Sequence, residues 1–130
     1  VREKNNDYNY LIFGLTKTRQ LLYNNINSRV DEMFENGLVD EVAFLMKKGY
    51  SKQAPGMKSI GYQECIEYLN GSLTLSGAGD LIKQNTRNYA KRQLTYFKRF
   101  SFEKWFEKDD ISINDSGVYE SIVADISKNI

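Results

Sequence analysis

Helical periodicity is the sequence feature that most constrains the fold of this chain. Near the N-terminus, apolar residues recur at intervals of four, four and three residues, which is the spacing of one buried stripe on a helix. The residues of this stripe are Leu22, Ile26, Val30 and Met33. We therefore predict a helix over residues 17–36, with Gly37 behind it as a left-handed cap.

The same reasoning predicts four further helices. Asp40 and Glu41 open the first of these and Lys47 and Lys48 close it, so its charges complement the helix dipole at both ends. Ser59 is a candidate N-cap for the next one. The expected ranges are 38–48, 59–69, 75–99 and 117–129. In this interpretation the first two helices of the chain form a helical hairpin.

One short stretch has strand character instead. The sequence "YLIFGL", residues 10–15, is apolar and rich in β-forming residues, so we predict a buried strand. A single strand makes no sheet, and two partners stay open: the short "KWF" at residues 104–106, or a sheet outside this chain. The predicted fold class is mainly α, with a helical hairpin, a long basic helix and one or two short strands.

Length and composition limit the remaining choices. A chain of 130 residues that is 41% hydrophobic and 27% charged suits one compact domain, residues 1–130. Because Cys65 is the sole cysteine and histidine is absent, disulfides, the usual zinc sites and His-based catalysis are excluded. Apolar runs of about five residues are too short to span a membrane, and a cytoplasmic location is the default expectation.

Positive charge gathers on the long helix. A helical wheel groups Lys83, Arg87, Lys91 and Lys98 in one sector, with Arg92 and Arg99 beside it. The whole chain has 18 basic and 17 acidic residues, so attraction to an anion has to come from such local clustering. No acidic residue lies four positions from a member of the sector. We interpret it as a surface for an anionic partner, the alternative being an ordinary solvated face.

Other positions carry two interpretations each. Thr86 and Gln93 fall on the apolar side of the long helix, where they need either a buried hydrogen-bond network or a bound base. Arg29 either pairs with Glu32 or reaches a bound phosphate. The segment "MKSIGYQE", residues 57–64, is either a plain turn or a phosphate-binding helix start.

Three segments together resemble a known family. They are "LYNNINSRVDEMFENGLVDEV" (22–42), "MKSIGYQECIEYLNG" (57–71) and "TRNYAKRQLTYFKR" (86–99), and they resemble the C-terminal part of bacterial tRNA dimethylallyltransferase, also called tRNA isopentenyltransferase. The resemblance implies transfer of a dimethylallyl group from dimethylallyl diphosphate to N6 of the adenine 3′ of the tRNA anticodon. It also implies that the strands complete an α/β core of the P-loop type in the whole enzyme.

The resemblance further implies roles for particular residues. Arg29 would be the catalytic arginine that binds the donor diphosphate and stabilises the charge on the leaving group. Contacts with the tRNA anticodon loop would come from two segments. In the first they are Lys58, Ser59, Ile60, Gly61, Tyr62 and Gln63; in the second they are Arg87, Lys91, Arg92, Gln93 and Thr95.

Several features of that family are not found in this sequence. They are the P-loop-like diphosphate cradle, the aspartate that acts as general base, and an inserted helical domain. We therefore expect a C-terminal fragment that is inactive alone, contains no metal site of its own, and depends on Mg²⁺ held by ligands outside it. An exposed strand edge favours self-association of such a fragment. The alternative function is a non-enzymatic helical domain that binds RNA or another protein.

Overall fold

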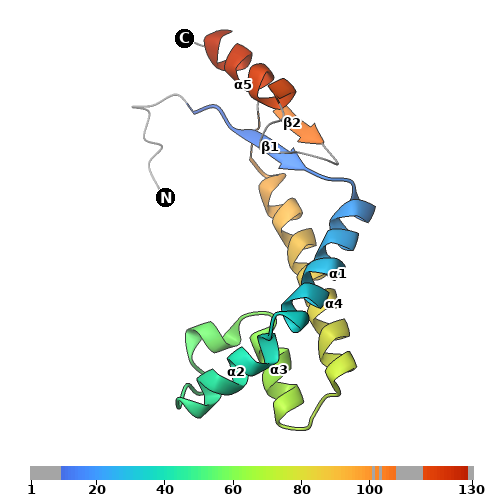
Figure 1. The fold of residues 1–130 in the computed structure, drawn as a ribbon. Helices are drawn as coiled ribbons and strands as arrows, with labels where there is room; N and C mark the ends of the chain where they lie inside the picture. Colours follow the sequence, from blue (N-terminus) through green and yellow to red (C-terminus); the bar gives the residue numbers. More distant parts are fainter. Residues whose placement is uncertain (1–9, 101, 103, 108–115, 129–130) are drawn as a thin grey trace. The chain divides into compact units, whose positions relative to one another are not determined.

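The computed structural model describes residues 10–100, 102, 104–107 and 116–128, and Figure 1 draws its fold. Its contacts group into two compact units, whereas the sequence analysis treats the chain as one domain. We call Leu22–Phe97 the helical unit, and we call the described residues before and after it the strand unit. Each unit is described by itself.

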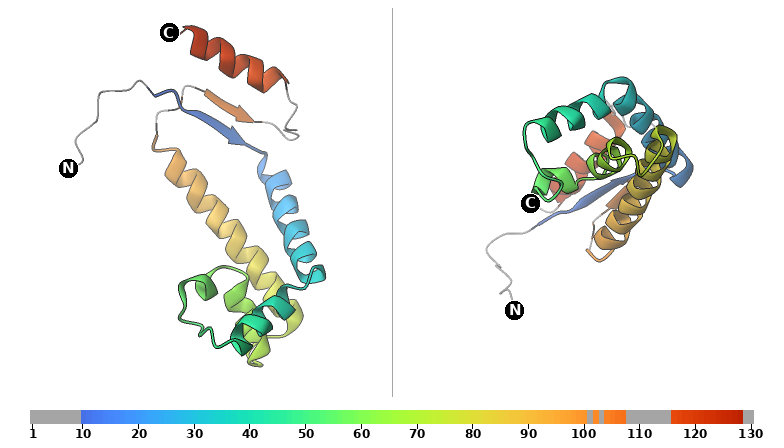
Figure 2. Two further views of the ribbon diagram at one scale, coloured as in Figure 1. Left: turned by 60° about the vertical axis from the view of Figure 1, so that its left-hand side comes forward. Right: turned by 90° about the horizontal axis from the view of Figure 1, so that it is seen from below.

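The helical unit is built from five helical segments. These are most of α1 (Arg19–Glu35), then α2 (Leu38–Lys47), the 3₁₀ helix η1 (Pro55–Lys58), α3 (Tyr62–Leu69) and α4 (Leu75–Phe97). The α-helices lie close to the predicted ranges, while η1 lies between two of the predicted helices. Figure 2 shows α2, η1 and α3 gathered where α1 ends and α4 begins.

A small apolar core holds the helical unit together. Its buried members are Val30, Leu38, Val42, Met57, Cys65, Ile66 and Ile82. Of the stripe predicted on α1, Val30 is buried, but Leu22, Ile26 and Met33 are only half-buried. The buried residues of α4 lie in its first third. The core is therefore confined to one end of the long helices, because the short α2 and α3 cover only that end.

Two glycines with positive φ set where helices begin and end. Gly37 has a φ of +90° and separates α1 from α2, which confirms the predicted left-handed cap. Gly61 has a φ of +100° and is the N-cap of α3. The predicted cap at Ser59 is wrong, because its hydroxyl donates to the carbonyl of Gly56 at 2.8 Å and α3 begins only at Tyr62.

In the strand unit, β1 (Phe13–Thr16) pairs in parallel with β2 (Lys104–Glu107). The strand predicted at residues 10–15 begins only at Phe13, and the prediction that it is buried is wrong, because Gly14 is its one buried residue. Of the two possible partners, the segment at residues 104–106 within the chain is the one it pairs with. Gly14 lies opposite Trp105, and a Cβ atom on Gly14 would come within 2.4 Å of the indole ring. The ring can approach this closely only because the strand has glycine here. The predicted mainly α class with two short strands is confirmed.

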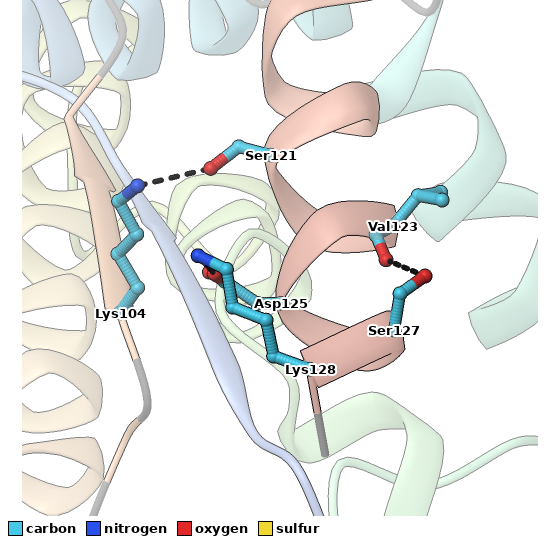
Figure 3. A network of polar contacts seen from close by, with 6 residues as sticks. All are labelled: Lys104, Ser121, Val123, Asp125, Ser127 and Lys128. Carbon is cyan, nitrogen blue, oxygen red and sulfur yellow. Dashed lines mark hydrogen bonds and ion pairs between the residues drawn. The ribbon is translucent and has the colours of Figure 1, made fainter. Parts of the chain in front are cut away.

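The strand unit is completed by α5 (Ser116–Lys128). Figure 3 shows the ammonium group of Lys104 donating a hydrogen bond to Ser121 Oγ at 2.9 Å, which links β2 to α5. The two elements each contribute one buried apolar residue, Phe106 and Val118. A polar link and apolar burial therefore both stabilise this small unit.

The longest helix, α4, ends at Phe97, two residues before the predicted end. Lys98 and Arg99 belong to the strand unit. The predicted sector of positive charge therefore does not continue through these two residues on α4, which corrects the helical-wheel assignment. Neither α4 nor any other helix among the described residues is long and apolar enough to cross a membrane.

Candidate anion-binding site

The helical unit contains an open pocket of about 900 Å³. Residues from α1, from α4 and from the segment 58–60 that precedes α3 line it. The buried core residues Val30 and Ile82 contribute to its apolar lining. The pocket therefore lies against the core, where its walls come from well-packed elements.

Three cationic side chains line this pocket, each from a different element. Arg29 comes from α1, Lys58 from the end of η1 and Arg92 from α4. Arg29 Nη1 lies 3.5 Å from Glu32 Oε2, with both side chains more than half exposed, so this pair contributes little. Among the described residues, no carboxylate forms an ion pair with Lys58 or Arg92. The pocket thus carries positive charge that the described carboxylates compensate only weakly.

Two hydroxyl groups and an aromatic ring add to the lining. Ser59 Oγ donates to a backbone carbonyl, as described above, and Thr86 Oγ1 donates to Ile82 O at 2.7 Å. Thr86 is half-buried and satisfied within its own helix, so it needs neither a buried network nor a ligand. Tyr89 is about half exposed, and its ring lies 5.9 Å from the guanidinium carbon of Arg92. This contact favours an Arg92 side chain that stays near the pocket.

Gln93 departs from its predicted environment. The sequence assigns it to a buried apolar side of the long helix, but Gln93 is exposed. Three aromatic residues of α4, Tyr89, Tyr96 and Phe97, are also exposed. The physical reason is that the core ends near Ile82, so the second half of α4 extends past it. Gln93 therefore requires no buried partner.

The basic sector of α4 is smaller than predicted. Lys83 Nζ lies 2.6 Å from Asp31 Oδ1, so a carboxylate on α1 neutralises it. Arg87 is half-buried and donates to Asn27 Oδ1 at 2.8 Å. Both partners lie on α1, and the spacing within one helix could not reveal them. The statement that this sector lacks compensation is therefore wrong for Lys83.

The remaining basic residue of this sector on α4 is accessible to solvent. Lys91 is exposed and forms no ion pair with a described carboxylate. Its ammonium group and the guanidinium of Arg87 each lie 6.0 Å from the ring centre of Tyr23 on α1. Thr95, one turn further, is exposed and donates to Lys91 O at 3.0 Å. Positive charge therefore remains accessible on α4 at Lys91 as well as at the pocket.

The first predicted tRNA-contacting segment, residues 58–63, divides at Gly61. Lys58, Ser59 and Ile60 line the pocket, as shown by its composition. Gly61 is buried, and the side chains of Tyr62 and Gln63 donate to Glu41 and to the carbonyl of Lys58 respectively. The hydrogen bond to Glu41 raises the pKa of the Tyr62 hydroxyl, and burial and the charge of Glu41 add to the shift. These three residues serve the local fold and do not line the pocket.

The structure thus brings together one part of the predicted site and separates the rest. The residues that meet at the pocket are Arg29, Lys58, Ser59, Ile60 and Arg92. The predicted residues that do not line it are Gly61, Tyr62, Gln63, Arg87, Lys91, Gln93 and Thr95. Asn25 and Tyr89 also line the pocket, and Asn27 and Asp31 are the partners of two basic residues of α4; none of these four was a predicted site residue. No local signal identifies these partners, because they lie on a helix far away in the sequence.

The described residues offer no metal site that would fit Mg²⁺. No group of three or more Cys, Asp or Glu residues that could hold a metal ion occurs among them, and the chain has no histidine. We therefore derive no chemical step through a metal from these residues.

An open pocket lined by three cations from three elements has the chemistry of a phosphate-binding site. A sequence model of the family described as IPP transferase matches residues 1–100. The chain belongs to this family, which confirms the resemblance found in the sequence.

The similar proteins are tRNA dimethylallyltransferases and tRNA isopentenylpyrophosphate transferases. The tRNA dimethylallyltransferase of Caldanaerobacter subterraneus subsp. tengcongensis is 53% identical over 108 residues, which cover 82% of this chain and 34% of that protein. The full-length tRNA isopentenylpyrophosphate transferase of Bacillus halodurans has a solved structure that matches with a TM-score of 0.83 and 37% identity, covering 96% of this chain and 42% of that one. The solved structure of the tRNA delta(2)-isopentenylpyrophosphate transferase of Staphylococcus epidermidis matches with a TM-score of 0.82 and 34% identity, covering 95% of this chain and 39% of that one. The chain spans about a third of the length of the curated relatives and matches their C-terminal part.

Proposed function

We propose that this chain is the C-terminal part of a tRNA dimethylallyltransferase and supplies that enzyme with a diphosphate-binding arginine and part of its tRNA-binding surface. The intact enzyme transfers a dimethylallyl group from dimethylallyl diphosphate to N6 of the adenine 3′ of the anticodon. Membership of the IPP transferase family and the names of the relatives support this reaction. The observation that carries the role of this chain is the convergence of Arg29, Lys58 and Arg92 on one pocket.

Arg29 is the residue for the donor. When N6 of adenine attacks the allylic carbon, the bond to the diphosphate breaks and negative charge grows on the leaving oxygen. A guanidinium group pairs with such an anion through two parallel hydrogen bonds and stays protonated throughout. Because the Glu32 pair is long and exposed, Arg29 can leave it at little cost when a diphosphate binds.

The acceptor RNA approaches the same pocket in this proposal. Lys58, Ser59 and Arg92 offer cationic and hydroxyl groups for a phosphate or a base, and Ile60 offers an apolar contact. Lys91 adds an accessible positive charge further along α4. Chemistry on a base requires that its nucleotide leaves the stack, and neighbouring phosphate contacts hold the displaced strand in place.

The rest of the active site is expected elsewhere in the enzyme. The P-loop-like cradle, the general base and the ligands of Mg²⁺ are not assigned to residues of this chain. That these residues alone are inactive, and that the enzyme works in the cytoplasm, stay predictions.

Arg29→Ala in the intact protein tests the proposal. We expect kcat/KM for dimethylallyl diphosphate to fall by roughly a hundredfold, since a charge-assisted contact is worth about 1.5 to 3 kcal/mol. The affinity for tRNA should change less than about threefold, because Arg29 is assigned to the donor. Lys47→Ala, which removes an exposed cation on α2, is the matched control and should leave both quantities unchanged.

The same experiment separates the enzyme from its alternative. A helical domain that only binds RNA would show no turnover in the wild-type protein. A loss of tRNA affinity in Arg29→Ala without an effect on donor kinetics would contradict the role given to this arginine.

A further inference from the structure

Glu64 on α3 is a buried carboxylate, with only 5% of its surface exposed. No described cation forms an ion pair with it. Instead, each carboxylate oxygen accepts one hydrogen bond: Oε2 from the backbone amide of Gly61 and Oε1 from the side-chain amide of Asn85, both at 2.7 Å. A buried carboxylate is tolerated only when such bonds replace water. Both oxygens are thus occupied within the protein.

The two donors are sequence neighbours of residues that form two different walls of the pocket. Gly61 directly follows the segment 58–60, which forms one wall, and Asn85 directly precedes Thr86 on α4, which lines the other. Glu64 is therefore the link between the segment that carries Lys58 and the helix that carries Arg92. The link is short, because it consists of one side chain and two hydrogen bonds.

The Glu64 carboxylate joins two N–H donors by accepting one hydrogen bond from each. A glutamine at position 64 could keep both contacts, because the Asn85 amide can turn its oxygen toward the new amide. An aspartate at position 64 is one methylene shorter and would not span the same distance. A leucine at position 85 would remove the donor on α4 and leave only the bond from Gly61.

We propose that Glu64 is a positioning residue that fixes the segment 58–60 relative to α4, so that one bound phosphate group is held from both walls at once. This inference rests on the proposed function, because it concerns the pocket assigned to phosphate. Glu64 itself touches no substrate. Its effect passes through the Gly61 amide on one side and the Asn85 side chain on the other.

The loss of one donor and a reciprocal exchange of carboxylate and amide test the inference in the intact protein. Asn85→Leu keeps a side chain of similar size but removes the donor on α4, which breaks the link. In the double variant Glu64→Gln/Asn85→Asp, the amide of residue 64 donates to the new carboxylate while its oxygen still accepts from Gly61. The link is kept, and the negative charge moves from residue 64 to residue 85. Glu67→Gln, one turn further along α3, is the matched control.

Two readouts are needed. By calorimetry with inorganic diphosphate, we expect Asn85→Leu to raise Kd by about tenfold and the double variant to stay within about threefold of wild type. By hydrogen exchange with mass spectrometry, the peptide over residues 57–63 should exchange faster in Asn85→Leu and at the wild-type rate in the double variant. The control should match wild type in both.

The outcomes distinguish this inference from the proposed function. If the wild-type protein does not bind diphosphate, the proposed function fails, while hydrogen exchange still reports whether residues 64 and 85 fix the segment. If Asn85→Leu is folded and keeps both the wild-type Kd and the wild-type exchange, the inference is overturned. It is also overturned if the double variant is folded but has neither the wild-type Kd nor the wild-type exchange.

Discussion

Cys65 lies next to Glu64 in the core of the helical unit and has no solvent exposure. Burial, and to a smaller extent the negative charge of Glu64, raises the pKa of its thiol to about 11. A thiol in this state is a small apolar group and a poor nucleophile at neutral pH. Cys65 therefore contributes packing and has no role in the proposed chemistry.

This pKa predicts a shifted alkylation profile. In the folded intact protein, the rate at which iodoacetamide modifies Cys65, followed by peptide mass spectrometry, should reach half its maximum near pH 11. In urea the same cysteine should titrate near its ordinary value of about 9. Because the folded pKa is the higher one, the stability from the protonated thiol is complete below pH 9 and is lost as the pH rises toward 11. A folded profile with its midpoint near pH 9 would contradict the burial of this group.

At the scale of the element, the two ends of α4 differ in how far their side chains are buried. Its first third buries Ala78 and Ile82 and belongs to the core, whereas its second half carries Lys91 and Arg92 with exposed side chains. The exposed cations of α4 therefore lie in its second half. The division follows from the small size of α2 and α3, which cover one end of the helix.

The second half of α4 predicts a salt effect. Lys91→Ala should weaken tRNA binding by the intact protein and reduce the slope of log K against log salt by about 0.7 to 0.9, the value for one lost phosphate contact. Lys52→Ala removes an exposed lysine from the loop before η1 and serves as the control. Filter binding at several salt concentrations measures both. An unchanged slope in Lys91→Ala would remove this residue from the RNA surface.

The helices also show which features of the fold could be predicted from the sequence. The helices of the chain follow from local periodicity and from Gly37, whose φ of +90° only glycine adopts readily, so they could be predicted. Arg29, Lys58 and Arg92 could be proposed as site residues from the resemblance, and they line one pocket. The start of α3 could not be predicted, because Ser59 looks like a cap while its hydroxyl bonds to the preceding turn.

Contacts between helices that are far apart in the sequence could not be predicted either. Asp31 neutralises Lys83 and Asn27 accepts from Arg87, but each pair joins α1 to α4 and leaves no trace in the spacing along either helix. The bond from Asn85 to Glu64 crosses 21 residues in the same way. Sequence patterns thus predict which face a residue occupies, and the fold decides which partner it meets.

At the scale of the whole molecule, this chain matches only about a third of the length of its curated relatives. The pocket of the helical unit is nevertheless assembled from residues of this chain alone, with a cation from each of three elements. The central claim is therefore that this pocket binds phosphate.

Calorimetric titration of inorganic diphosphate into the intact protein tests this claim most directly. The wild-type protein is compared with Arg29→Gln and with the triple variant Arg29→Gln/Lys58→Gln/Arg92→Gln. We predict that Arg29→Gln raises Kd by about tenfold and that the triple variant raises it by at least about a hundredfold, since each charged contact is worth more than 1 kcal/mol. A folded triple variant that binds diphosphate with the wild-type Kd would contradict the account.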